Sequence, residues 1–108
     1  MQRTILISLF SLSAMVTNAM AGPNADNDAV CKAIGGLAAT IMKHRQKNTP
    51  ISDLMDLETD ASLSKISRAL ILKAYEEPAY LTDKAQTRAV DTFRNDAELQ
   101  CFKAADNK

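Results

Sequence analysis

The chain has 108 residues, a formal net charge of zero, 46% hydrophobic residues and 24% charged residues. This composition allows the core of one small domain and gives none of the positive excess that is typical of nucleic-acid-binding proteins. There is no Trp, and there are only two Tyr and three Phe, so an aromatic platform for stacked bases is not expected. With only three Gly and three Pro, the chain favours a helical fold over a β-rich or low-complexity one.

The beginning of the chain has the pattern of a secretory signal peptide. Arg3 supplies a short positive region, residues 5–16 form an uncharged and mostly apolar run, and Ala19-Met20-Ala21 fits the small-x-small cleavage rule. A retained membrane anchor is the alternative, but the run is shorter than the about 20 apolar residues that span a bilayer. We therefore expect residues 1–21 to be removed by cleavage after Ala21. The mature chain is then expected in the periplasm or outside the cell, with no membrane association.

The rest of the chain, residues 22–108, is expected to form a single helical domain. Residues 22–27 are polar and are predicted to be a flexible tail. Apolar side chains then recur at helical spacing, with Asp26 or Asn27 as the candidate N-cap and Asn48 as the candidate end of a first helix.

Two local patterns stand out next: a glycine pair inside the expected first helix and a start signal for a second helix. Gly35-Gly36 lies inside the expected first helix, where a glycine pair permits either close contact with another helix or a kink. Thr49-Pro50 predicts a new start, with Thr49 as N-cap and Pro50 at the first helical position. The short second helix would carry the apolar residues Ile51, Leu54 and Met55, with Leu57 as a further candidate.

Two longer helices are expected to follow. Apolar spacing predicts a third helix over residues 61–76, which Pro78 ends. Thr82 is the predicted N-cap of a fourth helix, because Asp83 follows it in the first turn. The apolar stripe of this fourth helix comprises Val90, Phe93, Ala97, Cys101 and Ala104.

The two cysteines of the chain, Cys31 and Cys101, lie near opposite ends of the expected domain. In an oxidising compartment such a pair predicts a disulfide, which would stabilise the fold by about 4 kcal/mol through the entropy of the unfolded chain. A redox pair would need Cys-x-x-Cys spacing, and two distant cysteines match a metal site poorly. The expected fold is therefore all-α, a compact four-helix domain with a short second helix, whose first and last helices are linked by one disulfide.

The sequence contains no recognisable set of catalytic or metal-binding residues. His44 is the only histidine, and it lies among basic residues at the expected end of the first helix, which is typical of a solvated cation. Four acids between Asp53 and Asp60 partly match a calcium loop, but Ala61 and Ser67 stand where that loop needs Gly and Glu. We expect no catalytic residues, no metal and no cofactor.

The most distinctive surface candidate is the connection between the third and fourth helices, where two tyrosines flank acids and a proline. A tyrosine can bury its ring while its hydroxyl stays hydrated, so the residue suits interfaces. The alternative is that Tyr75 and Tyr80 pack the base of the bundle and the proline only ends a helix. If the basic end of the first helix lies nearby, Arg45 is expected to pair with Glu76 or Glu77. The candidate interaction surface comprises Arg45, Gln46, Tyr75, Glu76, Glu77, Pro78 and Tyr80.

The order of several segments along the chain carries a family resemblance. These segments are Cys31, Leu37-Ala38-Ala39-Thr40-Ile41-Met42 with Arg45-Gln46, Ala74-Tyr75-Glu76-Glu77-Pro78, Phe93 and Cys101. Their order resembles small exported helical proteins of Gram-negative bacteria and their prophages, over most of the mature chain, and this resemblance implies no particular activity. The chain is more loosely similar to periplasmic acid-stress chaperones, which are also exported, helical and held by one disulfide.

These observations favour a non-enzymatic periplasmic protein that binds or inhibits another envelope protein through a helical surface. No nucleic-acid partner is expected, and the oligomeric state is left open. The alternative is an acid-responsive periplasmic chaperone, because the 13 acidic residues lose their charge as the pH falls and self-repulsion then loosens the fold. A small cell-wall hydrolase that uses Glu76 or Glu77 with an aspartate is a third hypothesis, although no spacing singles out a pair.

Overall fold

The computed structural model describes residues 25–56 and 61–107. The expected signal peptide, its cleavage site, residues 22–24 of the expected tail and residues 57–60 of the acidic stretch lie outside this part. The described elements are four α-helices: α1 (Ala25–Gln46), α2 (Ile51–Met55), α3 (Ala61–Glu76) and α4 (Asp83–Asp106). The prediction of an all-α chain with a short second helix is therefore confirmed.

α1 begins earlier than its predicted cap. It starts at Ala25, so residues 25–27 of the expected tail are helical. Asp26 and Asp28 lie in the first turn, where carboxylates are stabilised by the partial positive charge of the helix N-terminus. Asp26, one of the two candidate N-caps, thus lies in the first turn instead.

α1 ends in a hydrogen-bonded cap that needs a left-handed residue. Asn48 has a φ of 58°, which Asn tolerates better than most residues. The Asn48 N–H donates to the Arg45 carbonyl at 3.0 Å, and the Thr49 N–H donates to the His44 carbonyl at 3.0 Å. This pair of bonds is the Schellman pattern of a helix C-terminus. Asn48 is therefore the turn residue beyond α1, whose last residue is Gln46.

The predicted N-cap role of Thr49 is wrong, whereas that of Thr82 is confirmed. The residue at the N-cap of α2 is Pro50, without a side-chain cap, because Thr49 is held in the C-terminal turn of α1 and its hydroxyl lies 3.2 Å from His44 Nδ1. At α4 the Thr82 hydroxyl accepts a hydrogen bond from the Ala85 N–H at 3.2 Å. The bounds of α3 agree with the prediction.

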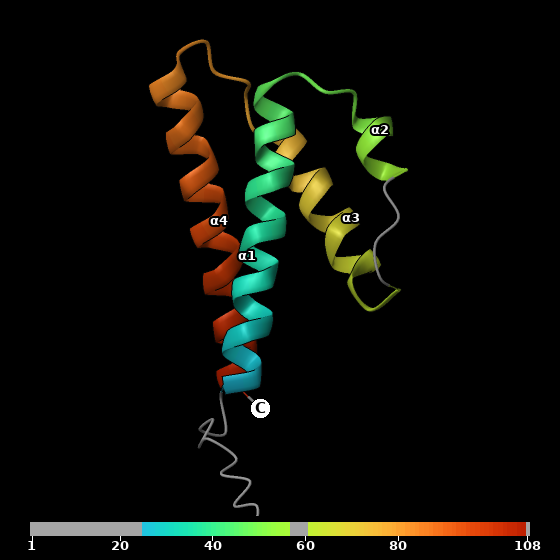
Figure 1. Ribbon diagram of the computed structural model, residues 1–108, viewed down its shortest axis with the longest axis vertical. Helices are drawn as coiled ribbons and strands as arrows, with labels where there is room; N and C mark the ends of the chain where they lie inside the picture. The colour runs from blue at the N-terminus through green and yellow to red at the C-terminus, as the bar shows by residue number, and fades with distance from the viewer. Residues whose placement is uncertain (1–24, 57–60, 108) are drawn as a thin grey trace, which may run out of the picture.

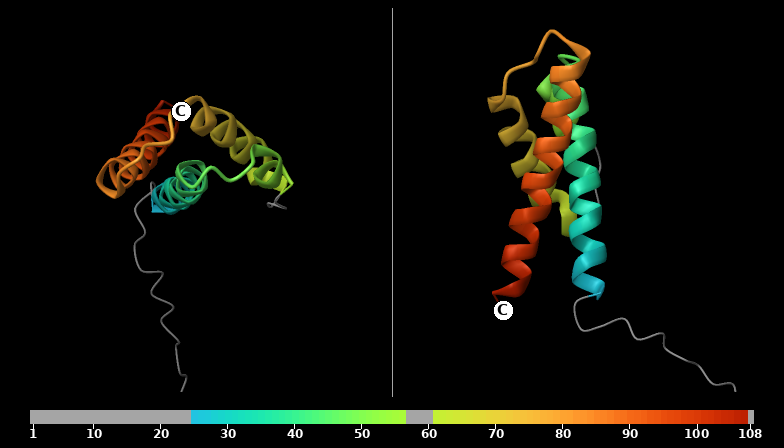
Figure 2. Two further views of the ribbon diagram at one scale, coloured as in Figure 1. Left: turned by 90° about the horizontal axis from the view of Figure 1, so that it is seen from above. Right: turned by 90° about the vertical axis from the view of Figure 1, so that its left-hand side faces the viewer.

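α1 is the central helix of the fold (Figure 1). α4 runs antiparallel beside it along most of its length, while α3 crosses α1 on another side and α2 packs on α3. α3 and α4 contact each other little, so each depends on α1 for its packing. Seen from above, α4 and α3 lie on different sides of α1 and form an open angle around it (Figure 2).

The core follows the apolar stripe of α1. Met42 and Ile71 are the largest aliphatic side chains in it that are fully buried, and Ala38 and Ala74 have no exposed surface at all. Small residues at these positions let α3 and α4 approach the central helix closely. The buried cluster comprises Ala38, Ala39, Ile41, Met42, Leu54, Ile71, Ala74, Val90 and Phe93.

The glycine pair in α1 serves close contact at one of its two positions. A Cβ atom at Gly35 would overlap the side chain of Glu98 on α4, whereas a Cβ atom at Gly36 would meet no other atom. Gly35 therefore provides the space in which the Glu98 side chain crosses α1, and Gly36 has no such role.

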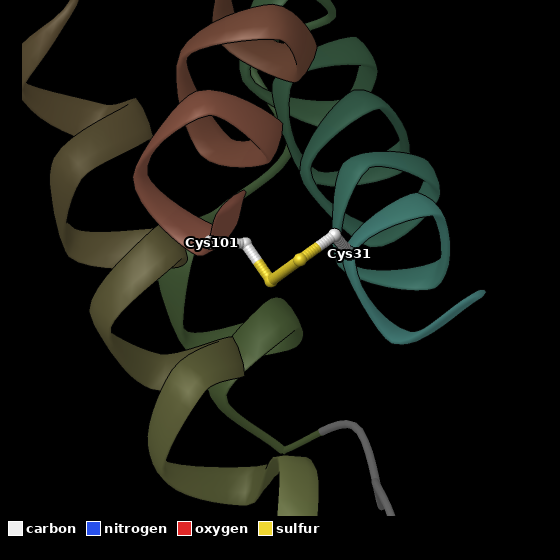
Figure 3. The surroundings of a disulfide bond; sticks show 2 residues. All are labelled: Cys31 and Cys101. Atoms are coloured by element: carbon white, nitrogen blue, oxygen red, sulfur yellow. A yellow bond between two sulfur atoms is a disulfide. The ribbon is translucent and has the colours of Figure 1, made fainter. Parts of the chain in front are cut away.

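The predicted disulfide joins the first and last helices. Cys31 and Cys101 are bonded with a Cα–Cα distance of 5.4 Å, which is within the usual range for a disulfide (Figure 3). The bond closes the end of the α1–α4 pair that lies opposite the connection between α3 and α4 (Figure 1). The two ends of the pair are thus held by different means, one covalent and one not.

Candidate interaction surface

The candidate surface lies at the connection between α3 and α4. We call residues 77–82 the junction segment; it follows Glu76, the last residue of α3, and ends at Thr82, the N-cap of α4. The connection passes close to the C-terminal end of α1 (Figure 1). This places the candidate residues of α1 and α3 together, as the sequence analysis expected for the basic end of the first helix.

Two side chains of α1 hold the backbone of the junction segment. Arg45 Nε donates a hydrogen bond to the Glu77 carbonyl at 2.9 Å, and Gln46 Nε2 donates to the Pro78 carbonyl at 2.9 Å. The Tyr80 N–H in turn donates to Gln46 Oε1 at 2.8 Å. A single amide group thus satisfies one acceptor and one donor of the segment, which fixes its path.

The expected ion pair of Arg45 with a glutamate is wrong. The guanidinium donates to the main-chain carbonyl of Glu77, and no ion pair of Arg45 occurs in the described residues. Gln46 was also predicted to form part of the interaction surface, but its side chain is only 5% exposed. Its amide is engaged inside the fold, where it also lies 3.4 Å from Met42 Sδ. Gln46 therefore supports the surface and does not form part of it.

Tyr75 is a half-buried support on the other side of Arg45. The Arg45 guanidinium carbon lies 5.2 Å from the centre of the Tyr75 ring, within the range of a cation–π contact. The Tyr75 hydroxyl donates a hydrogen bond to the Thr49 carbonyl. Burial raises the pKa of the Tyr75 hydroxyl above its ordinary value; Arg45 acts against this shift and Asp53 adds to it. Tyr75 thus follows the packing alternative for the tyrosines.

The first turn of α4 fixes the other end of the junction segment. Gln86 Nε2 donates to the Tyr80 carbonyl at 2.8 Å, and the Gln86 N–H donates to the Thr82 carbonyl at 2.9 Å. The segment is therefore tied to α1 before Tyr80 and to α4 after it.

The side chains that this backbone carries point largely to solvent. Glu76, Glu77 and Pro78 are exposed, and Tyr80 is 40% exposed. Tyr80 therefore differs from Tyr75 and remains accessible to a partner.

Leu81 is 99% exposed and was not among the residues predicted for the surface. Leu81 precedes the N-cap Thr82, a position from which an apolar side chain often packs on the fourth residue of the following helix. That residue is Gln86, a polar one, and it bonds to the Tyr80 carbonyl instead. Because the residue five positions after Leu81 is the polar Gln86, the sequence could have indicated that Leu81 lacks this packing partner.

A hollow of about 270 Å³ lies between the junction segment and α4. Two carboxylates, Glu77 and Asp96, and one cation, Arg88, line it together with the hydroxyl of Thr92. The remaining lining is formed by Met42, Tyr80, Ala85, Ala89 and Phe93. The hollow is thus apolar inside, with charges of both signs among the residues around it.

The described helices show no metal or membrane feature. Across residues 25–56 and 61–107, no group of three or more His, Cys, Asp or Glu side chains is placed to hold a metal ion. None of the helices in that part is long and apolar enough to cross a membrane. Comparisons of the chain with models of protein families, with curated proteins and with solved structures found no match.

Proposed function

We propose that the mature chain is a non-enzymatic periplasmic protein that binds or inhibits another protein of the cell envelope through the surface around the junction segment. One observation carries this proposal: the backbone of the segment is tied down from both α1 and α4, while the side chains of Glu76, Glu77, Tyr80 and Leu81 remain exposed.

A segment that is held in place before binding loses little conformational freedom when a partner binds. Ordering a loop and its side chains otherwise costs about 0.5–1.5 kcal/mol for each immobilised side chain. Tyr80 adds a large ring with a polar end, a residue type that is enriched at the centres of interfaces. The two exposed carboxylates beside it favour a partner that offers basic groups.

The periplasmic location is supported by the disulfide, because structural disulfides persist in oxidising compartments. The signal-peptide pattern of residues 1–21 points the same way.

The proposal can be tested by affinity capture from periplasmic extract of the organism that produces the chain. The bait is the disulfide-bonded mature protein, compared with the double charge reversal Glu76→Lys/Glu77→Lys. Asp106→Lys is the matched control, because it reverses an exposed carboxylate at the far end of α4. We expect one protein to be captured in stoichiometric amount by wild type and control, and much less of it by the double variant. Capture of nothing, or equal capture by all three baits, would refute the proposal.

A further inference from the structure

The junction segment carries one apolar side chain, that of Leu81, which is not packed against the rest of the fold. Leu81 is 99% exposed, although the backbone on either side of it is fixed by the Gln86 bond to the Tyr80 carbonyl and by the Thr82 cap. The largest exposed apolar side chains elsewhere in the described part are far more covered; Leu72, the next, is 54% exposed. Removing such a side chain from water favours association, and a fixed backbone reduces the entropic cost.

The hollow beside Leu81 has the size and lining to receive a leucine side chain. Its volume is about 270 Å³, and a dry cavity of about 150 Å³ already takes up benzene. Phe93, Ala85 and Ala89 form its apolar part. Tyr80 lines the hollow and Leu81 follows directly in the chain, so the projection lies next to the hollow. The exposure of Leu81 shows that it does not fill the hollow of its own chain.

The charges of this surface complement one another. Glu77, Asp96 and Arg88 all line the hollow and are exposed, and none of the three forms an ion pair within the described part of the chain. A surface that carries a projection, a matching hollow and charges of both signs meets the requirement of a two-fold interface, in which the same patch faces itself.

We propose that a second copy of this chain occupies this surface in a two-fold symmetric dimer. Leu81 of each copy enters the hollow of the other, and Glu77 of each copy lies near Arg88 of the other. A contact confined to this surface gives a weak dimer, with a dissociation constant between about 1 μM and 1 mM. The dimer covers Tyr80 and Glu77, so a protein partner at this surface competes with self-association.

Sedimentation equilibrium of the purified, disulfide-bonded mature protein tests this proposal at concentrations from about 1 μM to 1 mM. We expect reversible dimerisation of the wild type and a dissociation constant at least about tenfold higher for Leu81→Asp. Leu72→Asp is the matched control, because it places the same charge at an exposed leucine of α3 outside the hollow, and it should dimerise as the wild type does. Circular dichroism of each variant establishes that the monomer is folded.

A charge exchange tests the two-fold arrangement itself. Glu77→Arg and Arg88→Glu should each weaken the dimer, and the double variant Glu77→Arg/Arg88→Glu should restore it, because the two charges only change places. A wild type that stays monomeric throughout the range would overturn the proposal. A dissociation constant that Leu81→Asp leaves unchanged, or one that neither single charge reversal raises, would overturn it as well. No other protein is present in this experiment, so its failure leaves the proposed binding to an envelope protein standing, and the reverse also holds.

Discussion

Gln46 holds the candidate surface in place, and replacing it gives the most informative prediction. Its amide donates to the Pro78 carbonyl at 2.9 Å and accepts from the Tyr80 N–H at 2.8 Å, and its side chain is 5% exposed. Gln46→Ala removes two hydrogen bonds worth about 1 kcal/mol each and the contact of the amide nitrogen with Met42 Sδ. We therefore expect the free energy of unfolding to fall by about 2–4 kcal/mol.

Gln46→Glu separates the two bonds. The carboxylate still accepts from the Tyr80 N–H but faces the Pro78 carbonyl without a proton to donate, so the ionised form is disfavoured in the folded state. The pKa of the new carboxyl is then raised on folding, and the loss of stability relative to wild type is smallest at acidic pH and grows as the pH rises through that pKa.

Urea denaturation followed by circular dichroism measures both effects. Gln100→Glu is the matched control, because Gln100 lies exposed on α4 and its replacement should change stability by less than about 0.5 kcal/mol. If Gln46→Ala were also within about 0.5 kcal/mol of wild type, or if the Gln46→Glu deficit were the same at every pH, the supporting role of this side chain would be refuted.

Three further predictions concern other parts of the fold. Replacing Cys31 and Cys101 by serine should lower the free energy of unfolding by about 4 kcal/mol in urea denaturation; a loss below about 1 kcal/mol would show that the helices alone suffice. Gly36→Ala should stabilise by about 0.5–1 kcal/mol because its Cβ meets no atom, whereas Gly35→Ala should stabilise less, because its Cβ must displace the flexible Glu98 side chain; equal effects in thermal denaturation would contradict this reading. The raised pKa of Tyr75 in the folded state means that its contribution to stability is full below the ordinary pKa of 10.0 and is lost as the pH rises through the folded value. Tyr75→Phe should remove this part of the loss of stability at alkaline pH. Denaturation at a series of pH values measures the free energy of unfolding, and an alkaline profile equal to that of the wild type would contradict the prediction.

The parts of the fold that sequence alone predicts are those that depend on neighbouring residues. Pro78 and Thr82 set the end of α3 and the start of α4 through backbone restrictions and a cap that act over a few positions. The pair of cysteines near opposite ends of the expected domain predicted a disulfide between the first and last helices, and the structure confirms it. Thr49 had an equally good local pattern for an N-cap, but its N–H and its hydroxyl both contact His44 in the C-terminal turn of α1.

The organisation of the candidate surface depends on contacts that no local pattern reveals. Gln46 and its two backbone partners are separated by 32 and 34 residues, and a glutamine near the end of a helix usually lies in solvent. For the same reason Arg45 was expected to seek a carboxylate, whereas the packing of α3 on α1 places the Glu77 carbonyl within its reach. Each of these residues belonged to the predicted set, but the role of each within it required the three-dimensional arrangement.

The proposed function requires that the exposed side chains beside the junction segment bind a protein of the envelope. Isothermal titration of the captured protein with purified mature chain tests it most directly, with wild type, Glu76→Lys/Glu77→Lys and Asp106→Lys compared side by side. We expect a dissociation constant at least about tenfold higher for the double variant and an unchanged one for Asp106→Lys. Equal affinity of all three proteins would contradict the claim, because binding would then not involve this surface.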